Sequence, residues 1–240
     1  MTTAEVDQPR ETPSRLRAIA TAVALFVVAA GLFWLGIWQV QRRDWKLNLI
    51  SRVEQRLVAA PQELPGPADW RSVTDERDSY RRVEASGVLL KDRSIFTQAV
   101  TALGSGYWVM TPMQTDAGFN VFINRGFVPS ESKSLAFNAL SDVPVKIVGL
   151  LRMTEPHGGF LRTNDPTADR WFSRDVAVMA AKRDLANVAP YFIDSVAGLE
   201  SNGPVGGLTV VSFKNNHLIY AITWFVLSAM TLVAAVSLLK

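Results

Sequence analysis

Two long runs without a charged side chain, one near each end, constrain the fold of this chain more than any other feature. Residues 18–38 read AIATAVALFVVAAGLFWLGIW, and residues 218–239 read LIYAITWFVLSAMTLVAAVSLL. A helix rises about 1.5 Å per residue, so roughly 20 apolar residues cross a hydrocarbon core of about 30 Å. We therefore predict one transmembrane helix over residues 18–41 and a second over residues 214–239.

Each run has a plausible alternative. A cleaved signal peptide has an apolar core of about 7–15 residues and a cleavage site of small residues. The first run is longer and ends in the bulky sequence LFWLGIWQVQRR, which favours a retained anchor. A buried core helix is the alternative for the second run, and its length and terminal position argue against that.

The first 17 residues are predicted to form a disordered tail. They open with the polar sequence MTTAEVDQPRETPS, which contains two prolines. This segment also carries Glu5, Asp7 and Glu11, whereas mitochondrial transit peptides are poor in acidic residues. The tail therefore favours a bacterial inner-membrane protein.

The middle of the chain, residues 42–213, is long enough to bury a core of its own. The net charge is only +3, and basic residues alternate with acidic ones, as in DERDSYRRVE, so we expect no nucleic-acid binding. The chain has no cysteine, which excludes disulfides, thiol catalysis and zinc–thiolate sites. Nucleotide-binding, hydrolase and metalloprotease motifs are also missing, and the chain is predicted not to be an enzyme.

Short alternating segments in the middle predict a β-rich domain. Apolar residues over 44–60 recur at helical spacing. The first predicted helix should therefore continue out of the membrane and stop before Pro61. The sequence Asp116-Ala117-Gly118 predicts a hairpin turn, and residues 175–186 have the pattern of a helix. The predicted strands cover residues 80–90, 94–100, 107–114, 120–128, 144–152, 191–196 and 208–212.

The predicted fold class is therefore membrane α + β. Two transmembrane helices form an N- and C-terminal hairpin that flanks one domain. The core of this domain is a mainly antiparallel β barrel or sandwich with a few helices.

The end of the first run carries aromatic and basic residues on one helical face. Trp34, Trp38, Arg42 and Trp45 follow each other at helical spacing. Tryptophan and arginine favour the headgroup level of a membrane, so the simplest interpretation is an interfacial belt. A second role on the same face stays compatible with that belt.

The start of the second run carries a polar and aromatic face. The face begins at His217 and continues three, seven and eleven residues later with Tyr220, Trp224 and Ser228. Polar residues on a membrane helix usually face protein or a cofactor. The alternative for His217 is an ordinary interfacial or helix-capping histidine.

In a hairpin, the end of the first span and the start of the second lie at the same membrane surface. A neutral imidazole can ligate a metal, and haem iron is commonly held by histidine. Arginine matches carboxylate geometry and could pair with haem propionates. The candidate site residues at this surface are Trp38, Arg42, Arg43, His217, Tyr220 and Trp224.

Other motifs have structural interpretations. The segment 124–129 (NRGFVP) is taken as a strand end or turn with an exposed Arg125. Residues 164–166 (NDP) predict a turn, and Asp175 is expected at a helix N-terminus. His157 is expected to be solvated in a loop.

Four motifs in order resemble those of the Surfeit locus protein 1 family, which assists assembly of haem–copper cytochrome oxidases. They are residues 36–46 (GIWQVQRRDWK), 124–129, 164–166 with Trp171, and 216–225 (NHLIYAITWF). The resemblance covers residue 36 to the C-terminus with both spans in place. The chain departs from the family at Phe127, where many relatives hold tryptophan.

This resemblance implies that the protein helps deliver haem a to cytochrome c oxidase subunit I. His217 would be the ligand of the haem iron, because the corresponding histidine is the family's proposed ligand. The implied partners are subunit I, haem A synthase and the lipid bilayer. The termini would be cytoplasmic and the domain periplasmic, in a multi-pass protein of the bacterial inner membrane.

The charges beside the two runs do not choose this orientation. The domain side carries Arg42, Arg43, Lys46 and Lys214, and the other side carries Arg10, Arg15, Arg17 and Lys240. The positive-inside rule therefore gives a tie. A competing hypothesis is a scaffold that holds oxidase subunit I without touching haem, and a third is a membrane enzyme.

Overall fold

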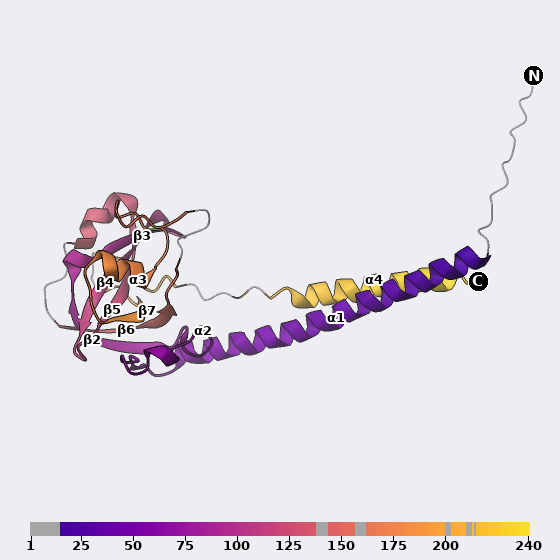
Figure 1. Cartoon of the computed structure of the whole chain (residues 1–240), viewed down its shortest axis with the longest axis horizontal. Coiled ribbons are helices and arrows are strands. Elements are labelled where there is room, and N and C mark those ends of the chain that lie inside the picture. The colour runs from indigo at the N-terminus through magenta and orange to yellow at the C-terminus, as the bar shows by residue number, and fades with distance from the viewer. Residues whose placement is uncertain (1–14, 138–143, 157–161, 200–202, 210–212, 214) are drawn as a thin grey trace, which may run out of the picture. The chain divides into compact units, whose positions relative to one another are not determined.

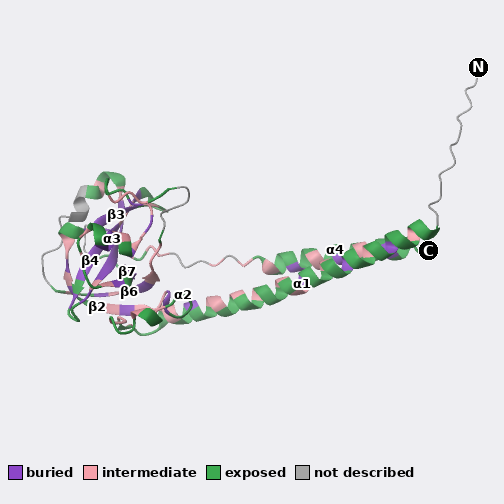
Figure 2. Cartoon of the chain, in the orientation of Figure 1, coloured by how far each residue is buried: buried purple, intermediate pink, exposed green. Residues whose placement is uncertain are grey.

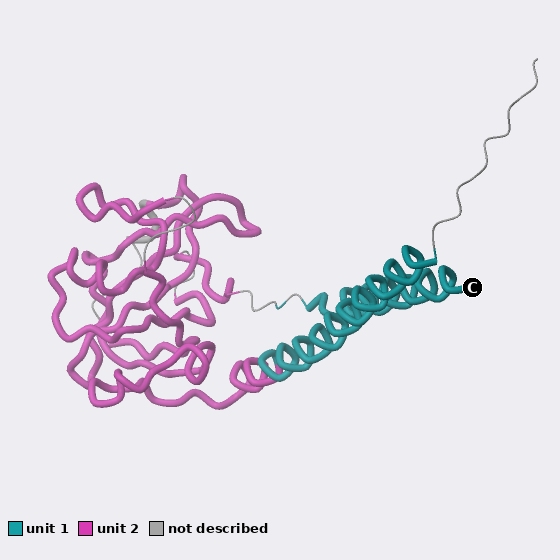
Figure 3. Tube along the Cα trace, turned by 45° about the vertical axis from the view of Figure 1, so that its right-hand side comes forward, with its two compact units in different colours: residues 1–50, 212–240 teal, residues 51–211 magenta. Residues whose placement is uncertain are grey.

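The computed structural model describes residues 15–137, 144–156, 162–199, 203–209, 213 and 215–240. It divides into two compact units, shown in Figure 3. One combines residues 1–50 with residues 212–240, and the other is the domain of residues 51–211. Residues 1–14, His157 and part of the predicted strand 208–212 lie outside the described residues.

The first unit contains helix α4 and most of helix α1, up to residue 50, and the two helices lie side by side (Figure 1). Helix α1 spans Arg15–Val58 without interruption, and helix α4 spans His217–Ser237. Their most apolar windows have mean hydropathies of 2.4 and 2.0, so both are long and apolar enough to cross a membrane. The predicted continuation of the first helix to a point before Pro61 is confirmed. The exact limits of the two spans stay predictions.

The second unit holds a seven-stranded sheet. Its strands are β1 Gln62–Glu63, β2 Arg82–Leu89, β3 Ile95–Thr101, β4 Gly104–Thr115, β5 Asn120–Pro129, β6 Val145–Met153 and β7 Val188–Ser195. Short helices lie between them: η1 Trp70–Ser72, α2 Asp75–Asp78, η2 Lys91–Arg93, η3 Ser130–Phe137 and α3 Val176–Lys182.

Pairing between β2 and β4 closes the sheet into a barrel. The strand order is β1-β2-β6-β7-β5-β4-β3, and Gly87–Leu89 of β2 also pair with Thr115–Met113 of β4. The closed ring therefore contains β2, β6, β7, β5 and β4. Most neighbours are antiparallel, as predicted, but β5 pairs with β7 in parallel and β1 with β2 in parallel.

The predicted hairpin between β4 and β5 is confirmed, with Gln114 paired to Asn120. Gly118 has φ +83°, a left-handed conformation that glycine adopts without steric cost. The amide of Thr115 donates to the carbonyl of Phe119 over 2.9 Å, which closes the turn. Local turn chemistry therefore determined this part of the sheet.

The barrel wall is buried on both faces where β5 and β7 meet. Val121, Ile123 and Ile193 point into one core cluster, whereas Phe122 and Phe192 point into another, which α3 covers. This alternation follows from the two-residue period of a strand. Figure 2 shows the result: the barrel strands are largely buried, and most residues of the two long helices are exposed.

Two local predictions need correction. The helix predicted over 175–186 ends at Lys182, although Asp175 does cap it, accepting a 3.3 Å hydrogen bond from the Val178 amide. Leu208 and Thr209 are in no strand. Instead, Val205 forms an isolated antiparallel bridge with Phe127 at the end of β5.

Candidate functional site

A seam of small residues joins α1 to α4. Buried residues recur every seven positions on both helices, and small side chains let two membrane helices approach closely. On α1 they are Ala22, Ala29 and Gly36, and on α4 they are Ala221, Ser228 and Ala235. We call these six residues the seam and letter their heptad position a.

Contacts across the seam fix an antiparallel register. The Ser228 hydroxyl donates to the carbonyl of Ala29 over 2.8 Å, and the rings of Phe33 and Phe225 lie 5.3 Å apart. A Cβ atom at Gly36 would collide with the ring of Phe225. Glycine is therefore required at position 36 for this close approach.

His217 lies at the first residue of α4, where its Nδ1 is 2.7 Å from Oε1 of Gln39. Gln39 follows Leu25 and Leu32 at seven-residue spacing, which is heptad position d of α1, and all three are half-buried. We did not single out Gln39 from the sequence. The seven-residue spacing was the signal that would have placed it on the helix-facing side.

The tryptophan and arginine face of α1 is exposed. The Arg42 guanidinium stacks 4.0 Å from the centre of the Trp45 ring, and Trp38 is exposed one turn earlier. Arg43 is half-buried and forms a 3.3 Å ion pair with the neighbouring Asp44. Arg42 therefore has a guanidinium without a carboxylate partner among the described residues.

Heptad geometry decides which predicted residues share a side of the helix pair. In an antiparallel pair, residues at position e of both helices flank one side of the seam, and residues at position g flank the other. Phe33 and Phe225 occupy e positions and do contact each other. Arg42 and Tyr220 occupy g positions, so they flank the opposite side together.

The predicted face of His217, Tyr220, Trp224 and Ser228 is therefore not one open surface. Ser228 is buried in the seam, and Trp224 is half-buried at position d beside it. Tyr220 is 55% exposed, and its g position assigns it to the same side as Arg42. Of this face, His217 and Tyr220 remain available at the side where Trp38 and Arg42 are exposed.

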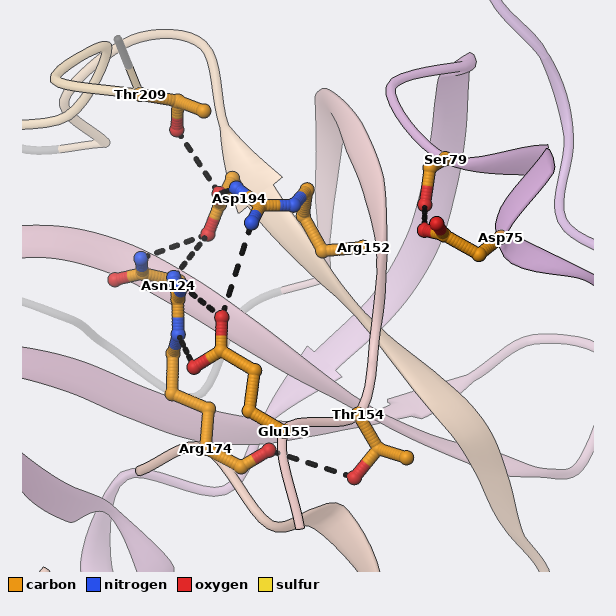
Figure 4. Close-up of polar contacts among 9 residues, drawn as sticks. All are labelled: Asp75, Ser79, Asn124, Arg152, Thr154, Glu155, Arg174, Asp194 and Thr209. Carbon is orange, nitrogen blue, oxygen red and sulfur yellow. Dashed lines mark hydrogen bonds and ion pairs between the residues drawn. The ribbon is translucent and has the colours of Figure 1, made fainter. Parts of the chain in front are cut away.

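A second polar cluster lies in the barrel domain around Asp194 (Figure 4). Asp194 is buried and accepts hydrogen bonds from Asn124 over 2.8 Å, Arg152 over 3.0 Å and Thr209 over 2.9 Å. Arg174 lies 3.3 Å from the same carboxylate and pairs through its Nε with Glu155 over 2.9 Å. Two carboxylates and two guanidinium groups balance their charges here.

Electrostatics of this cluster indicate a structural role. Burial alone would lower the pKa of Arg174, but its hydrogen bonds to Glu155 and the charge of Asp194 raise that pKa above the ordinary value. The arginine is therefore held in its charged form. Within the described residues, no three histidine, aspartate or glutamate side chains are grouped to hold a metal ion.

The prediction of an exposed Arg125 is wrong. Arg125 is 1% exposed and lies within β5, a strand buried on both faces. Its neighbour Gly126 has φ +129°, and its amide donates to the Asn124 side chain over 3.1 Å. A Cβ at Gly126 would collide with the backbone of Val205, so this motif fastens the segment that follows β7 to the barrel.

Two helices long and apolar enough to cross a membrane, with a closed β-barrel domain between them in the sequence, indicate a protein of the membrane-associated class. Within that class, the chain belongs to the SURF1 family, whose family model matches residues 26–229. This family is known for cytochrome c oxidase assembly factors.

Curated relatives agree with this assignment. The chain is 34% identical over 230 residues to Surfeit locus protein 1 of Homo sapiens, covering 86% of this chain and 73% of the relative. Surfeit locus protein 1 of Rattus norvegicus is 34% identical over 226 residues, covering 86% and 72%. A SURF1-like protein of Monosiga brevicollis is 33% identical over 226 residues, covering 87% and 84%.

Proposed function

We propose that this protein is a cytochrome c oxidase assembly factor that binds haem a and assists its insertion into oxidase subunit I. Family membership supports the assembly role. One observation carries the haem proposal: a histidine at the end of the helix pair is held through Nδ1, while its Nε2 has no hydrogen-bond partner among the described residues. Histidine is a common axial ligand of haem iron.

The side chains around His217 fit a haem cargo with one protein ligand. Haem carries an apolar macrocycle and two anionic propionates. Arg42 offers a guanidinium that is not engaged by a described carboxylate, and Trp38 and Tyr220 offer exposed aromatic surface. Arg43 is the weaker candidate for a propionate because it is paired with Asp44.

A single ligand at the edge of a helix pair suits delivery. The cargo has to leave, so its binding should be weak enough for transfer. Trp224 contributes to the site from its half-buried position beside the seam. Haem a is therefore a transient cargo in this proposal, received from haem A synthase and passed to subunit I.

We place the protein in a bacterial inner membrane as a multi-pass protein. Both long helices cross the bilayer, and the barrel domain lies in the periplasm in this proposal. Because an alkaline phosphatase fusion is active only in the periplasm, fusions after Ala117 and Lys240 would test the orientation. Activity from Lys240 alone would reverse it.

Haem content of the purified full chain tests the ligand assignment. From cells that make haem a, we expect the wild type to retain haem and His217→Ala to lose it on the order of tenfold or more, since the ligand is removed. His157→Ala is the matched control, because it removes the chain's other histidine. Equal haem content in His217→Ala and wild type would contradict the proposal.

A scaffold that holds subunit I without haem is the second candidate. Trp34 is 68% exposed and Trp38 is 49% exposed on α1, which favours a surface for a partner helix. The absorption spectrum of the wild-type protein distinguishes the two functions. A haem-free protein from a strain that makes haem a would favour the scaffold.

A further inference from the structure

The contact between His217 and Gln39 determines more than helix packing. A polar residue in the core of a helix pair can specify register. Any polar pair at this level of the two helices, however, could specify the register. Here an amide oxygen lies 2.7 Å from one particular ring nitrogen, Nδ1.

Oε1 of Gln39 faces Nδ1, and an amide oxygen can only accept, so this contact is a hydrogen bond in the tautomer that carries its proton on Nδ1. A neutral imidazole holds one proton, and the other nitrogen then presents a lone pair. In His217 that nitrogen is Nε2. The contact therefore selects the tautomer in which Nε2 can donate electrons to a metal.

We propose that Gln39 is a positioning residue that sets the tautomer and the ring orientation of His217. The use of this tautomer rests on the proposed haem binding. The tautomer itself is a property of the protein without haem. Metal-ligating histidines usually donate their second ring N–H to an oxygen, which fixes the ring and raises ligand basicity. Gln39 supplies that oxygen from the neighbouring helix.

Substitutions at Gln39 separate this role from packing. Gln39→Leu keeps a side chain of similar size, as Leu25 and Leu32 have at the preceding d positions, but removes the acceptor. Gln39→Glu keeps an acceptor and makes it stronger. A packing role predicts that the two variants affect the helix pair without changing the chemistry of Nε2.

The first measurement uses the full chain without haem in detergent. A His157→Gln background leaves His217 as the only histidine, so ¹H–¹⁵N NMR reports which ring nitrogen carries the proton. We expect Nδ1 in the parent and in Gln39→Glu, and a shift toward the Nε2-protonated form in Gln39→Leu. An Nε2-protonated ring in the parent, or an unchanged ring in Gln39→Leu, overturns the proposal.

The second measurement uses protein purified from cells that make haem a. We expect Gln39→Leu to lower haem content on the order of tenfold, as removal of such partners does in other metal sites. Gln39→Glu should retain haem and shift its reduction potential to a more negative value, because a more basic ligand stabilises oxidised iron. Equal potentials and contents in all three proteins would contradict the positioning role.

The two measurements distinguish a failure of the proposed haem function from a failure of the positioning role of Gln39. If the parent binds no haem but its His217 is protonated on Nδ1 and responds to Gln39→Leu, the haem function is wrong and the positioning by Gln39 stands. If the parent binds haem through His217 but its tautomer does not depend on Gln39, the haem function stands and this inference is wrong.

Discussion

The Ser228 hydroxyl donates a 2.8 Å hydrogen bond to the backbone carbonyl of Ala29, in the middle of the seam between the two long helices. Hydrogen bonds between membrane helices contribute only about 0.6 kcal/mol on average. Close packing along the small residues at the a positions is therefore expected to contribute more to the stability of the helix pair than this bond.

A large side chain at Gly36 should separate the helices. Gly36→Leu would drive atoms into the ring of Phe225, whereas Gly31→Leu meets no atom within 4 Å of the new Cβ and is the matched control. We expect overpacking in Gly36→Leu to lower the stability of the helix pair by about 1–3 kcal/mol, and Gly31→Leu to change it little. Disulfide formation between introduced Ala29→Cys and Ser228→Cys measures helix association, since the chain has no other cysteine.

A compensating change checks this explanation. Phe225→Ala should restore part of the cross-linking lost in Gly36→Leu, because it removes the atoms that collide. Equal cross-linking in Gly31→Leu and Gly36→Leu would show that the seam does not require a small residue at position 36.

Gly126→Ala should destabilise the barrel domain. Gly126 combines φ +129° with a Cβ position that collides with the backbone of Val205, whereas Gly118 has φ +83° and open space around it. Gly118→Ala should therefore cost only the backbone strain, about 1 kcal/mol, and Gly126→Ala about 2–4 kcal/mol. Urea unfolding, monitored by near-ultraviolet circular dichroism, measures the loss in free energy of unfolding for each variant. Equal midpoints would contradict the close approach of Val205 to Gly126.

Asp194→Asn should destabilise the domain more than a surface change. The substitution keeps the size of the side chain but leaves Arg152 and Arg174 with less negative charge around them. Breaking a buried ion pair costs about 3–5 kcal/mol, whereas Glu84→Gln breaks an exposed pair with Lys146 and should cost about 0–1 kcal/mol. Urea unfolding measures both, and a smaller loss for Asp194→Asn would exclude a stabilising role for the cluster.

Asp169 should make the stability of the domain depend on acid pH. Burial raises the pKa of this carboxyl, but hydrogen bonds from Arg183 over 2.8 Å and from the Trp171 indole over 2.7 Å outweigh it and lower the pKa below the ordinary value. A lowered folded pKa stabilises the fold above the unfolded pKa of about 4 and loses that contribution as pH falls through the folded value.

Asp169→Asn should therefore flatten the acid limb of the stability profile. The amide still accepts from the indole but cannot titrate, so the variant should be less stable than wild type at pH 7 and closer to it at pH 2–3. Unfolding midpoints across this range measure the difference. A constant gap at all pH values would mean that the carboxylate charge does not stabilise the fold.

Local sequence determined much of the architecture. The two long helices were predicted because twenty uncharged residues in a row carry their own signal, and the β4–β5 hairpin was predicted because Asp116-Ala117-Gly118 encodes a turn. His217 was chosen as a candidate from its residue type and its place at the start of a span. These signals depend on residues close together in the chain.

Long-range contacts decided the rest. Closure as a barrel rather than a sandwich required β2 to pair with β4, and β5 met β7 in parallel although Asn124 and Asp194 are 70 residues apart. Arg125 was expected at the surface because charged residues are rarely buried, but it lies in a strand that neighbouring elements cover on both faces.

The same distinction applies to the candidate site. From the sequence by itself, a histidine, arginines and tryptophans are predicted to gather at one membrane surface, where the first span ends and the second begins. Only the tertiary structure decided that Gln39 meets Nδ1 of His217 and that Ser228 faces α1. The physical reason is that the register of two antiparallel helices depends on how closely small residues on both of them can pack.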